Sequence, residues 1–241
     1  MRLPEIESRP EWRIGVSSHF PQIRPVYSAS LPFPPGNCST STNPVNTVTL
    51  LLDAVGTLIQ PSEPVGRTYA GHLAAATGIS VEPTRMQSAF LDALGSAATP
   101  DYSLHPFGHA AEYAWWRDLV SSVLQSLGGE AAQFAACRLS TCDLPTFDSY
   151  FESLFTHYAD PDAWVLFPEV LPFLAEASKL GTPAVVSNFD DRLAPILAGL
   201  GTGPFLKDIF TSADARARKP DRALFSLALD RLNSSPGEAI H

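Results

Sequence analysis

A short apolar run that ends in a carboxylate constrains the fold of this chain more than any other feature of its sequence. The run from Val48 to Leu52 is apolar or β-branched throughout, which is typical of a strand buried on both faces. Asp53 follows directly, and Gly56 lets the next turn of backbone approach a ligand closely. Ligands of open α/β sheets bind at the carboxyl ends of strands, so Asp53 is a candidate nucleophile. The alternative is a strand that ends in an ordinary turn, in which Asp and Gly are common.

Composition narrows the class of protein. With 241 residues, of which 45% are hydrophobic and 17% charged, the chain is long enough for one large domain or a core with an inserted subdomain. A net charge of −9 does not suit nucleic acid or anionic membranes, and the longest apolar runs are too short to span a bilayer. Cys38, Cys137 and Cys142 lack the spacing of a zinc site or an even disulfide set, which indicates a reducing, cytoplasmic compartment.

Residues 1–46 differ from the rest of the chain. They are rich in proline and in polar, helix-breaking residues and show no apolar periodicity, so we expect a disordered N-terminal extension. No acidic residue occurs between Glu11 and Asp53, and this Ser/Thr-rich stretch resembles an organelle transit peptide. Glu5, Glu7 and Glu11 argue against that alternative.

The stretch from residue 60 to about 165 contains no convincing strand, and its apolar residues recur at helical spacing. Gly128 and Gly129 mark the end of one helix, and Trp115 and Trp116 are more typical of a core than of a cofactor site. We therefore expect a helical insertion at 60–165. Its inner faces are expected to carry Tyr69, Leu73 and Ala76; Met86, Phe90 and Leu94; Ala111, Trp115, Leu119 and Leu127; and Phe147, Tyr150, Phe151, Leu154 and Phe155.

After Pro161 the pattern changes to alternating helices and strands, which predicts βαβ units and a parallel sheet. The expected elements are a helix at 168–180, a strand at 183–186, a helix at 191–200, a strand at 208–211 and a helix at 220–232. Residues 47–59 and 166–241 would together form an α/β core.

Three chemically active side chains should meet at one edge of this sheet. Asp53 ends the first strand, Ser187 ends the second, and Lys219 precedes the last helix. Parallel strands bring their carboxyl ends together, so a carboxylate, a hydroxyl and an ammonium would converge. Taken singly, Ser187 could be a helix cap and Lys219 a solvated surface lysine.

These segments resemble the first three motifs of the haloacid dehalogenase-like hydrolases, in the same order, over about residues 47–241. The matching residues are Asp53 to Leu58, Ser187 to Asp190, and Lys219 with Pro220. The resemblance implies a Rossmann-like parallel sheet with a helical cap inserted after the first strand. Trp115 with Trp116, and Arg192 with Leu193 after Ser187–Asp190, resemble one particular group within that family.

The resemblance also implies roles for individual residues. Asp53 would attack a phosphoryl group of a small phosphorylated metabolite and form an aspartyl-phosphate, and Lys219 would balance the negative charge. Thr57, Ser187, Asn188 and Lys219 would bind the phosphoryl oxygens. Mg²⁺ would be held by Asp53 and the backbone carbonyl of Val55, since it prefers oxygen ligands. The cap would select the substrate, and the candidates to point inward are Arg67, His72, Trp115, Trp116 and Arg117.

Val55 departs from the phosphatase pattern. Phosphatase members have a second Asp at this position, which protonates the leaving oxygen and later activates water, and a valine cannot transfer a proton. The dehalogenases of the family carry Asp-Ala-Tyr-Gly-Thr, one residue away from the segment that begins at Asp53. They displace halide from carbon without a metal, so a 2-haloacid dehalogenase is an alternative function.

The end of the sequence is the second departure. Residues 238–241 look like the start of the strand that precedes the fourth motif, which supplies acidic metal ligands in the family. We therefore expect a truncated core that lacks its last strands and leaves residues 47–53 as an apolar edge. Val55 and the absent fourth motif argue against efficient phosphatase activity. They favour either a weak hydrolase or a catalytically silent relative that acts in binding.

Overall fold

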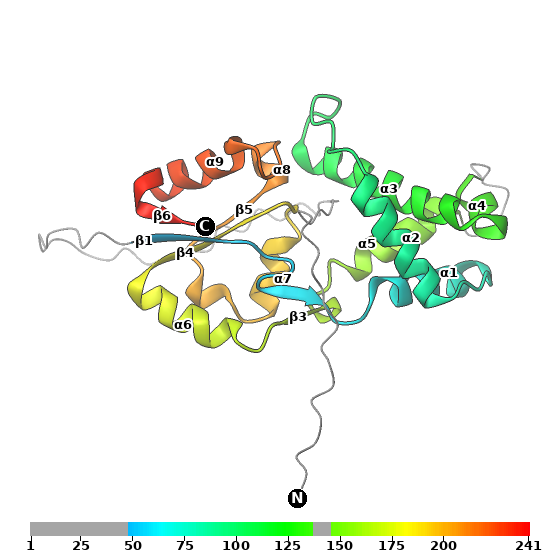
Figure 1. The fold of residues 1–241 in the computed structure, drawn as a ribbon, viewed down its shortest axis with the longest axis horizontal. Helices are drawn as coiled ribbons and strands as arrows, with labels where there is room; N and C mark the ends of the chain where they lie inside the picture. The colour runs from blue at the N-terminus through cyan, green and yellow to red at the C-terminus, as the bar shows by residue number, and fades with distance from the viewer. Residues whose placement is uncertain (1–47, 137–145) are drawn as a thin grey trace, which may run out of the picture.

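The computed structural model describes residues 48–136 and 146–241. The expectations for residues 1–46 and for the three cysteines concern residues outside these ranges. Two parts lie side by side in Figure 1: a sheet covered by helices on both faces, here called the sheet lobe, and a bundle of helices, here called the helical lobe. The predicted α/β class with a parallel sheet is confirmed.

The sheet lobe contains β1 (Val48–Leu52), α6 (Val170–Leu180), β4 (Gly181–Ser187), α7 (Leu193–Gly199), β5 (Ile209–Thr211), α8 (Ser212–Ala215), α9 (Arg222–Leu232) and β6 (Ala239–Ile240). The helical lobe contains α1 (Val65–Thr77), α2 (Pro83–Ser96), α3 (Gly108–Leu127), α4 (Gly129–Ala136) and α5 (Phe147–His157). β2 (Ile59–Pro61) and β3 (Trp164–Leu166) lie between the lobes. Short 3-10 helices elsewhere in the described residues occupy Pro161–Ala163, Gly203–Phe205 and Pro236–Glu238.

The order of the strands decides where a ligand can bind. The four-stranded sheet has the order β5-β4-β1-β6 and all of its pairs are parallel. From β1 the chain proceeds outward through β4 to β5, and β6 then returns to the opposite side of β1. The strand order therefore reverses at β1. In open α/β sheets this reversal creates the crevice in which ligands bind, beyond the carboxyl ends of the strands.

Both faces of the sheet are covered, which explains why β4 carries consecutive apolar residues before Ser187. Ala184, Val185 and Val186 are each 0% exposed. Leu51, Ala184 and Val186 pack on the side of α9, whereas Val185 belongs to the larger cluster that contains α6 and α7 (Figure 1). A strand with apolar residues at consecutive positions is the pattern of a parallel strand enclosed by helices.

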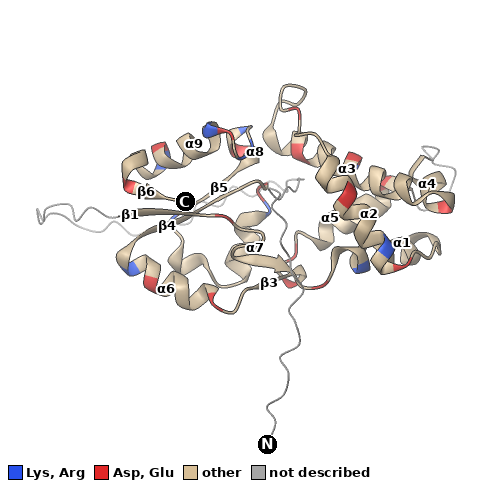
Figure 2. Ribbon diagram, in the orientation of Figure 1, with Lys and Arg blue, Asp and Glu red and all other residues tan. Residues whose placement is uncertain are grey.

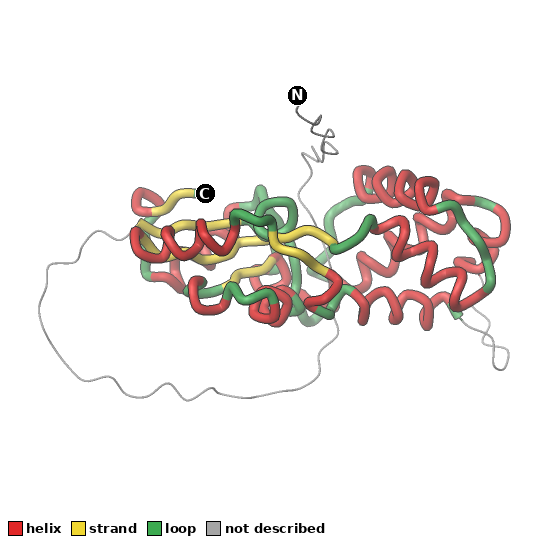
Figure 3. Tube along the Cα trace, turned by 90° about the horizontal axis from the view of Figure 1, so that it is seen from below, coloured by secondary structure: helices red, strands yellow, loops and turns green. Residues whose placement is uncertain are grey.

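Aromatic side chains form a large part of the core of the helical lobe. Tyr69, Phe90, Trp116 and Phe151 are nearly fully buried, and the tube in Figure 3 shows the helices of this lobe packed alongside one another. Phe90 stacks on Trp116 at 6.2 Å between ring centroids and meets Tyr69 edge to face at 5.6 Å. The interpretation of these aromatics as core residues is confirmed.

Two sequence-based expectations about residues 60–165 are wrong. β2 and β3 pair antiparallel at its two ends, with Gln60 opposite Val165, although no strand was expected there. Their three residues are too few to show a period, and the partner lies about a hundred positions away in the chain. α4 also begins at Gly129, where the glycine pair was expected only to end a helix. Gly128 and Gly129 both have positive φ, so the chain turns there and starts a new helix.

The last helix and strand, α9 and β6, follow Lys219 in the chain. α9 begins at Arg222 and not at Pro220, because the Asp221 side chain accepts a hydrogen bond from the Ala223 amide at 2.8 Å and caps the helix. The start of a strand expected at residues 238–241 is confirmed, since β6 pairs with Thr49 and Leu50. β1 is therefore not the bare edge that was expected, because β6 covers part of it.

Figure 2 shows Lys and Arg spread over both lobes and not gathered along one element. Among the helices of the described ranges, none is long and apolar enough to cross a membrane.

His72 is expected to make the stability of the helical lobe depend on pH. It lies half-buried on α1, with Nδ1 2.9 Å from the Ser153 hydroxyl and its ring centroid 5.3 Å from that of His157. Burial, together with the nearby His157, lowers the pKa of His72 below its ordinary value, and Glu63 offsets part of this. The unfolded chain then binds the extra proton more readily, so this contribution to stability is present above the ordinary histidine pKa and is lost as the pH falls.

We expect the melting temperature of the wild type to drop more between about pH 7.5 and about pH 5.5 than that of His72→Gln, which keeps a hydrogen-bonding group for Ser153. Differential scanning calorimetry of both proteins across this range measures the difference. Equal acid sensitivity would show that His72 does not contribute.

Candidate active site

Asp53 stands at the carboxyl end of β1, at the reversal of strand order. Its Oδ1 accepts a hydrogen bond from the Ala54 amide at 2.8 Å, which fixes the side chain relative to the backbone. The turn that follows is tight, because the amides of Leu58 and Ile59 both donate to the Ala54 carbonyl at 2.7 and 3.0 Å. Gly56 makes this turn possible with a φ of +82°.

Ser187 and Lys219 converge on the same carboxylate oxygen. The Ser187 hydroxyl donates to Asp53 Oδ1 at 2.8 Å, and Lys219 Nζ lies 2.9 Å from that atom. The side chain of Asp53 is 26% exposed and that of Lys219 only 9%, so the ion pair is largely shielded from solvent while the carboxylate keeps an open side. The structure therefore brings together the three side chains that the sequence placed at this edge.

Asn188 holds the backbone of Lys219. Its Oδ1 accepts from the Lys219 amide at 2.7 Å, and its Nδ2 donates to the Lys219 carbonyl at 3.2 Å. Asn188 is 1% exposed, and these two hydrogen bonds to the backbone N–H and C=O of Lys219 fix the start of the lysine side chain against the end of β4. In this arrangement Asn188 places Lys219, and its binding to phosphoryl oxygens stays a prediction.

Thr57 and Val55 lie in the turn after Asp53. Thr57 is exposed and donates its backbone amide to Ala54 at 3.1 Å. Val55 is half-buried and packs against the larger hydrophobic cluster. No proton-transferring group therefore occupies the position two residues after Asp53.

The fit of a metal can be tested on the oxygens around Asp53. The hydrogen bonds of this side chain and its ion pair with Lys219 use Oδ1, which leaves Oδ2 open. Within the described ranges, no group of three His, Cys, Asp or Glu side chains is arranged to hold a metal. Mg²⁺ is commonly held by one or two carboxylates with water and substrate phosphate completing the shell. The Asp53 carboxylate and the Val55 carbonyl fit that chemistry but supply only part of it.

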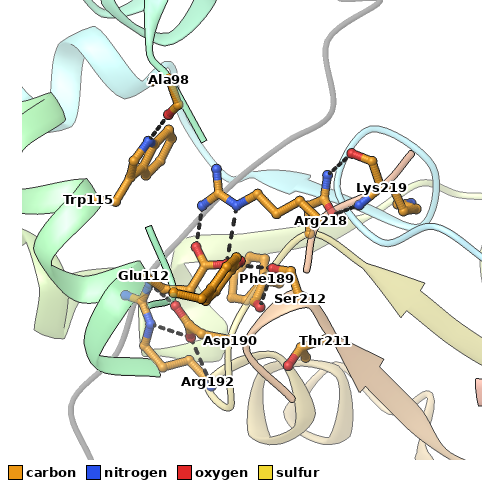
Figure 4. Close-up of polar contacts among 12 residues, drawn as sticks. Ala98, Glu112, Trp115, Phe189, Asp190, Arg192, Thr211, Ser212, Arg218 and Lys219 are labelled. Atoms are coloured by element: carbon orange, nitrogen blue, oxygen red, sulfur yellow. Dashed lines mark hydrogen bonds and ion pairs between the residues drawn. The ribbon is translucent and has the colours of Figure 1, made fainter. Parts of the chain in front are cut away.

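The five residues expected to point inward from the helical lobe do not lie together in the structure. Arg67 is exposed near Glu63, and Arg117 pairs with Asp148 at 2.6 Å. Trp116 is in the core of the helical lobe, and His72 contacts Ser153. Of the five, Trp115 lies at the boundary between the lobes, where its ring is 4.1 Å from the guanidinium carbon of Arg218 (Figure 4).

Sequence reasoning missed a buried group of charges beside the site. Glu112 of α3 is 0% exposed and pairs with Arg218, which directly precedes Lys219. Asp190 and Arg192 form a second buried pair, with 3.0 Å between Arg192 Nε and Asp190 Oδ1. A glutamate on the apolar face of a predicted helix was a signal that could have identified Glu112.

Comparison with known proteins decides the family. The family model described as a hydrolase, haloacid dehalogenase-like hydrolase, matches residues 47–241. The chain belongs to the haloacid dehalogenase-like hydrolase family. Within it, the chain is 31% identical over 198 residues to haloacid dehalogenase-like hydrolase domain-containing protein 3 of Danio rerio, covering 80% of this chain and 74% of the relative. The Bos taurus protein of the same name is 33% identical over 196 residues, covering 80% and 72%.

These relatives form the group indicated by the Trp115–Trp116 pair and by the segment that begins at Ser187, so the predicted group is confirmed. Solved structures of this hydrolase family share the fold. The L-2-haloacid dehalogenase from Xanthobacter autotrophicus has a TM-score of 0.55 at 18% identity, covering 80% of this chain and 68% of that one. A predicted phosphoglycolate phosphatase from Haemophilus somnus has a TM-score of 0.52 at 17% identity, covering 82% and 76%.

Proposed function

We propose that this haloacid dehalogenase-like hydrolase transfers a phosphoryl group from a small phosphorylated metabolite to Asp53 and releases it slowly. The observation that carries the proposal is the convergence of Ser187 and Lys219 on one oxygen of a partly exposed carboxylate at the reversal of strand order. A carboxylate held in this way is a preformed nucleophile next to a fixed cation.

The two oxygens of Asp53 have different roles in this proposal. Oδ1 is engaged by the Ala54 amide, the Ser187 hydroxyl and the Lys219 ammonium, and these contacts orient the carboxylate. Oδ2 is free of contacts with described residues, so it is the oxygen that attacks phosphorus. The new O–P bond forms as the bond between phosphorus and the leaving oxygen breaks. Lys219 offsets the repulsion between the carboxylate and the incoming phosphate dianion.

Mg²⁺, when bound by the Asp53 carboxylate and the Val55 carbonyl, would neutralise further negative charge on the phosphoryl group. Charge neutralisation by the chain itself rests on Lys219. The Ser187 hydroxyl is placed to donate to a phosphoryl oxygen once the adduct has formed, because its donor already points to the carboxylate.

Val55 sets the limits of this activity. The leaving oxygen needs a proton unless it departs as a weak base, and Val55 has none to give. The chain should therefore favour substrates with good leaving groups, such as phenyl esters with electron-withdrawing substituents. Hydrolysis of the adduct also lacks a base at this position, so the aspartyl-phosphate should accumulate.

Rapid mixing of the protein with p-nitrophenyl phosphate and Mg²⁺ is expected to give a burst of about one p-nitrophenolate per chain, followed by slow turnover. Asp53→Asn should abolish both phases, because the amide is a poor nucleophile. Mass spectrometry of acid-quenched protein should find the phosphate on Asp53. Robust burst activity in Asp53→Asn would contradict the proposal.

Dehalogenation is a second candidate, and Val55 favours it. A halide ion leaves without a proton, so attack of Asp53 on the carbon that carries the halogen needs no acid at position 55. Incubation with 2-chloropropionate distinguishes the two functions: halide release that depends on Asp53, without a p-nitrophenolate burst, would replace the first proposal. If neither substrate reacts with a folded protein, the result favours the third alternative, a catalytically silent relative that acts in binding.

A further inference from the structure

The segment between α8 and α9 connects the helical lobe to the candidate active site. Arg216 reaches the loop before α3, where its guanidinium donates to the carbonyls of Pro106 at 2.9 Å, His105 at 3.0 Å and Tyr102. Two residues later Arg218 extends to α3, and Lys219 turns to Asp53. Neighbouring side chains of one short segment therefore contact the helical lobe and the nucleophile.

Glu112 is the centre of the contact with the helical lobe. Its Oε1 accepts from Arg218 Nε at 3.2 Å, from the Ser212 hydroxyl at 2.6 Å and from the Tyr102 hydroxyl at 2.5 Å, and its Oε2 accepts from Arg218 Nη2. Figure 4 shows the Arg218 side chain directed to Glu112 and Trp115, while Lys219 lies at the other end of the arginine. Glu112 and Ser212 are 0% exposed and Arg218 is 5% exposed.

The backbones of the two lobes also meet here. A Cβ added to Gly108, at the start of α3, would lie 1.9 Å from the Ala213 carbonyl oxygen of α8. α3 and α8 are therefore as close as a glycine allows, and Glu112 lies one turn further along α3. This close contact between α3 and α8 leaves Arg218 little space to move to a different partner.

Charge explains why the identity of Glu112 matters for Lys219. Arg218 and Lys219 are adjacent cations, and each has a carboxylate of its own. Arg218 Nη1 is buried and has no hydrogen-bond acceptor among the described residues, so Glu112 supplies the counter-charge for this guanidinium. A buried charge that loses its partner strongly favours any rearrangement that solvates or pairs it. Such a rearrangement moves the peptide that also carries Lys219.

We propose that Glu112 is a positioning residue for Lys219: by pairing with Arg218 it fixes the backbone from the side of the helical lobe, as Asn188 does from the sheet. The seating of α3 on α8 then determines whether Lys219 reaches Asp53. The role of Lys219 in the reaction rests on the proposed function, whereas its positioning by Glu112 does not. The linkage itself can be measured without any turnover.

The chain has three lysines, Lys179, Lys207 and Lys219, which makes the test specific. A brief pulse of acetic anhydride followed by mass spectrometry gives the acetylation rate at each. The Lys179 side chain is 65% exposed and Lys207 is exposed, so these two report general loosening of the protein. Lys219, which is shielded and paired with Asp53, should react more slowly than both in the wild type.

Glu112→Gln should raise the acetylation rate of Lys219, relative to the rates of the two reference lysines, by about fivefold. This factor corresponds to the loss of an ion pair worth about 1 kcal/mol. Asp53→Asn is the positive control, because it removes the partner of Lys219 directly. The matched control is Glu152→Gln. Glu152 accepts a hydrogen bond from the Tyr113 hydroxyl within the helical lobe.

An unchanged ratio in a Glu112→Gln protein with native circular dichroism would overturn the proposal. If that variant does not fold, the double variant Glu112→Gln, Arg218→Met removes both buried charges and is measured in its place. A rise at Lys219 in the double variant supports the proposal, and the wild-type ratio overturns it. Failure of the phosphatase proposal has a different signature. The wild type would then give no p-nitrophenolate burst, although its Lys219 is still acetylated slowly.

Discussion

Replacing Val55 with aspartate is expected to raise the steady-state rate of p-nitrophenyl phosphate hydrolysis by about 10²–10⁴-fold. The position lies two residues beyond the nucleophile, in the turn that Gly56 makes possible. A carboxyl group there can protonate the leaving oxygen and then take a proton from the water that attacks the aspartyl-phosphate. Because adduct breakdown limits turnover in the proposed mechanism, the slow phase should accelerate more than the burst.

Val55→Asn is the matched control, since it has nearly the shape of the aspartate but cannot exchange a proton. Combining Val55→Asp with Asp53→Asn tests whether the gained activity still uses the same nucleophile. Val55 is half-buried against the hydrophobic cluster, so thermal melts must accompany the kinetics. A folded Val55→Asp protein that turns over no faster than Val55→Asn would show that position 55 does not limit the reaction.

Asp190→Asn is expected to lower the free energy of unfolding by about 3–5 kcal/mol, because it leaves Arg192 as an uncompensated buried charge. Arg192 places Nε and Nη2 on the two oxygens of Asp190 at 3.0 Å each, and its guanidinium lies 3.9 Å from the ring centre of Phe155. Asp190 is 0% exposed and Arg192 5% exposed. Burial raises the pKa of Asp190 above its usual range, and the paired Arg192 offsets only part of this.

The measurement is urea unfolding at about pH 8, above the raised pKa, where Asp190 carries its charge. The same change at Asp148 is the control, since its pair with Arg117 is on the surface, with the two side chains 66% and 30% exposed. Exposed pairs contribute about 0–1 kcal/mol, so Asp148→Asn should be nearly silent. Equal effects at the two positions would show that burial of the Asp190 pair is not what makes it important.

The active-site triad was accessible to sequence reasoning because each of its residues follows a recognisable local pattern. Asp53 and Ser187 end apolar runs, and Lys219 precedes a helix whose start is marked by Pro220 and Asp221. Parallel pairing then requires the strand ends to share an edge, and the register of Leu52 opposite Val185 brings Asp53 and Ser187 together. The role of Asn188 was less accessible, because its partner is a peptide 31 positions away.

The pairing of β2 with β3 and of Glu112 with Arg218 could not be predicted from the sequence in the same way. Strands of three residues have no measurable period, and their pairing depends on where a helical insertion of about a hundred residues returns the chain. Glu112 and Arg218 are 106 positions apart, and either would pass for a surface charge until α3 is seated on α8. Only then are both removed from water.

The sequence alone determined the class of fold, the candidate nucleophile Asp53 and the two side chains that converge on it, because hydrophobic periodicity and strand ends are local properties. It also determined the limit on the chemistry, since Val55 cannot move a proton wherever it lies. The tertiary structure alone decided which charges are buried between the lobes and therefore what holds Lys219 against Asp53. Desolvation gives a charge its energetic importance, and it arises only when elements remote in the chain close over that charge.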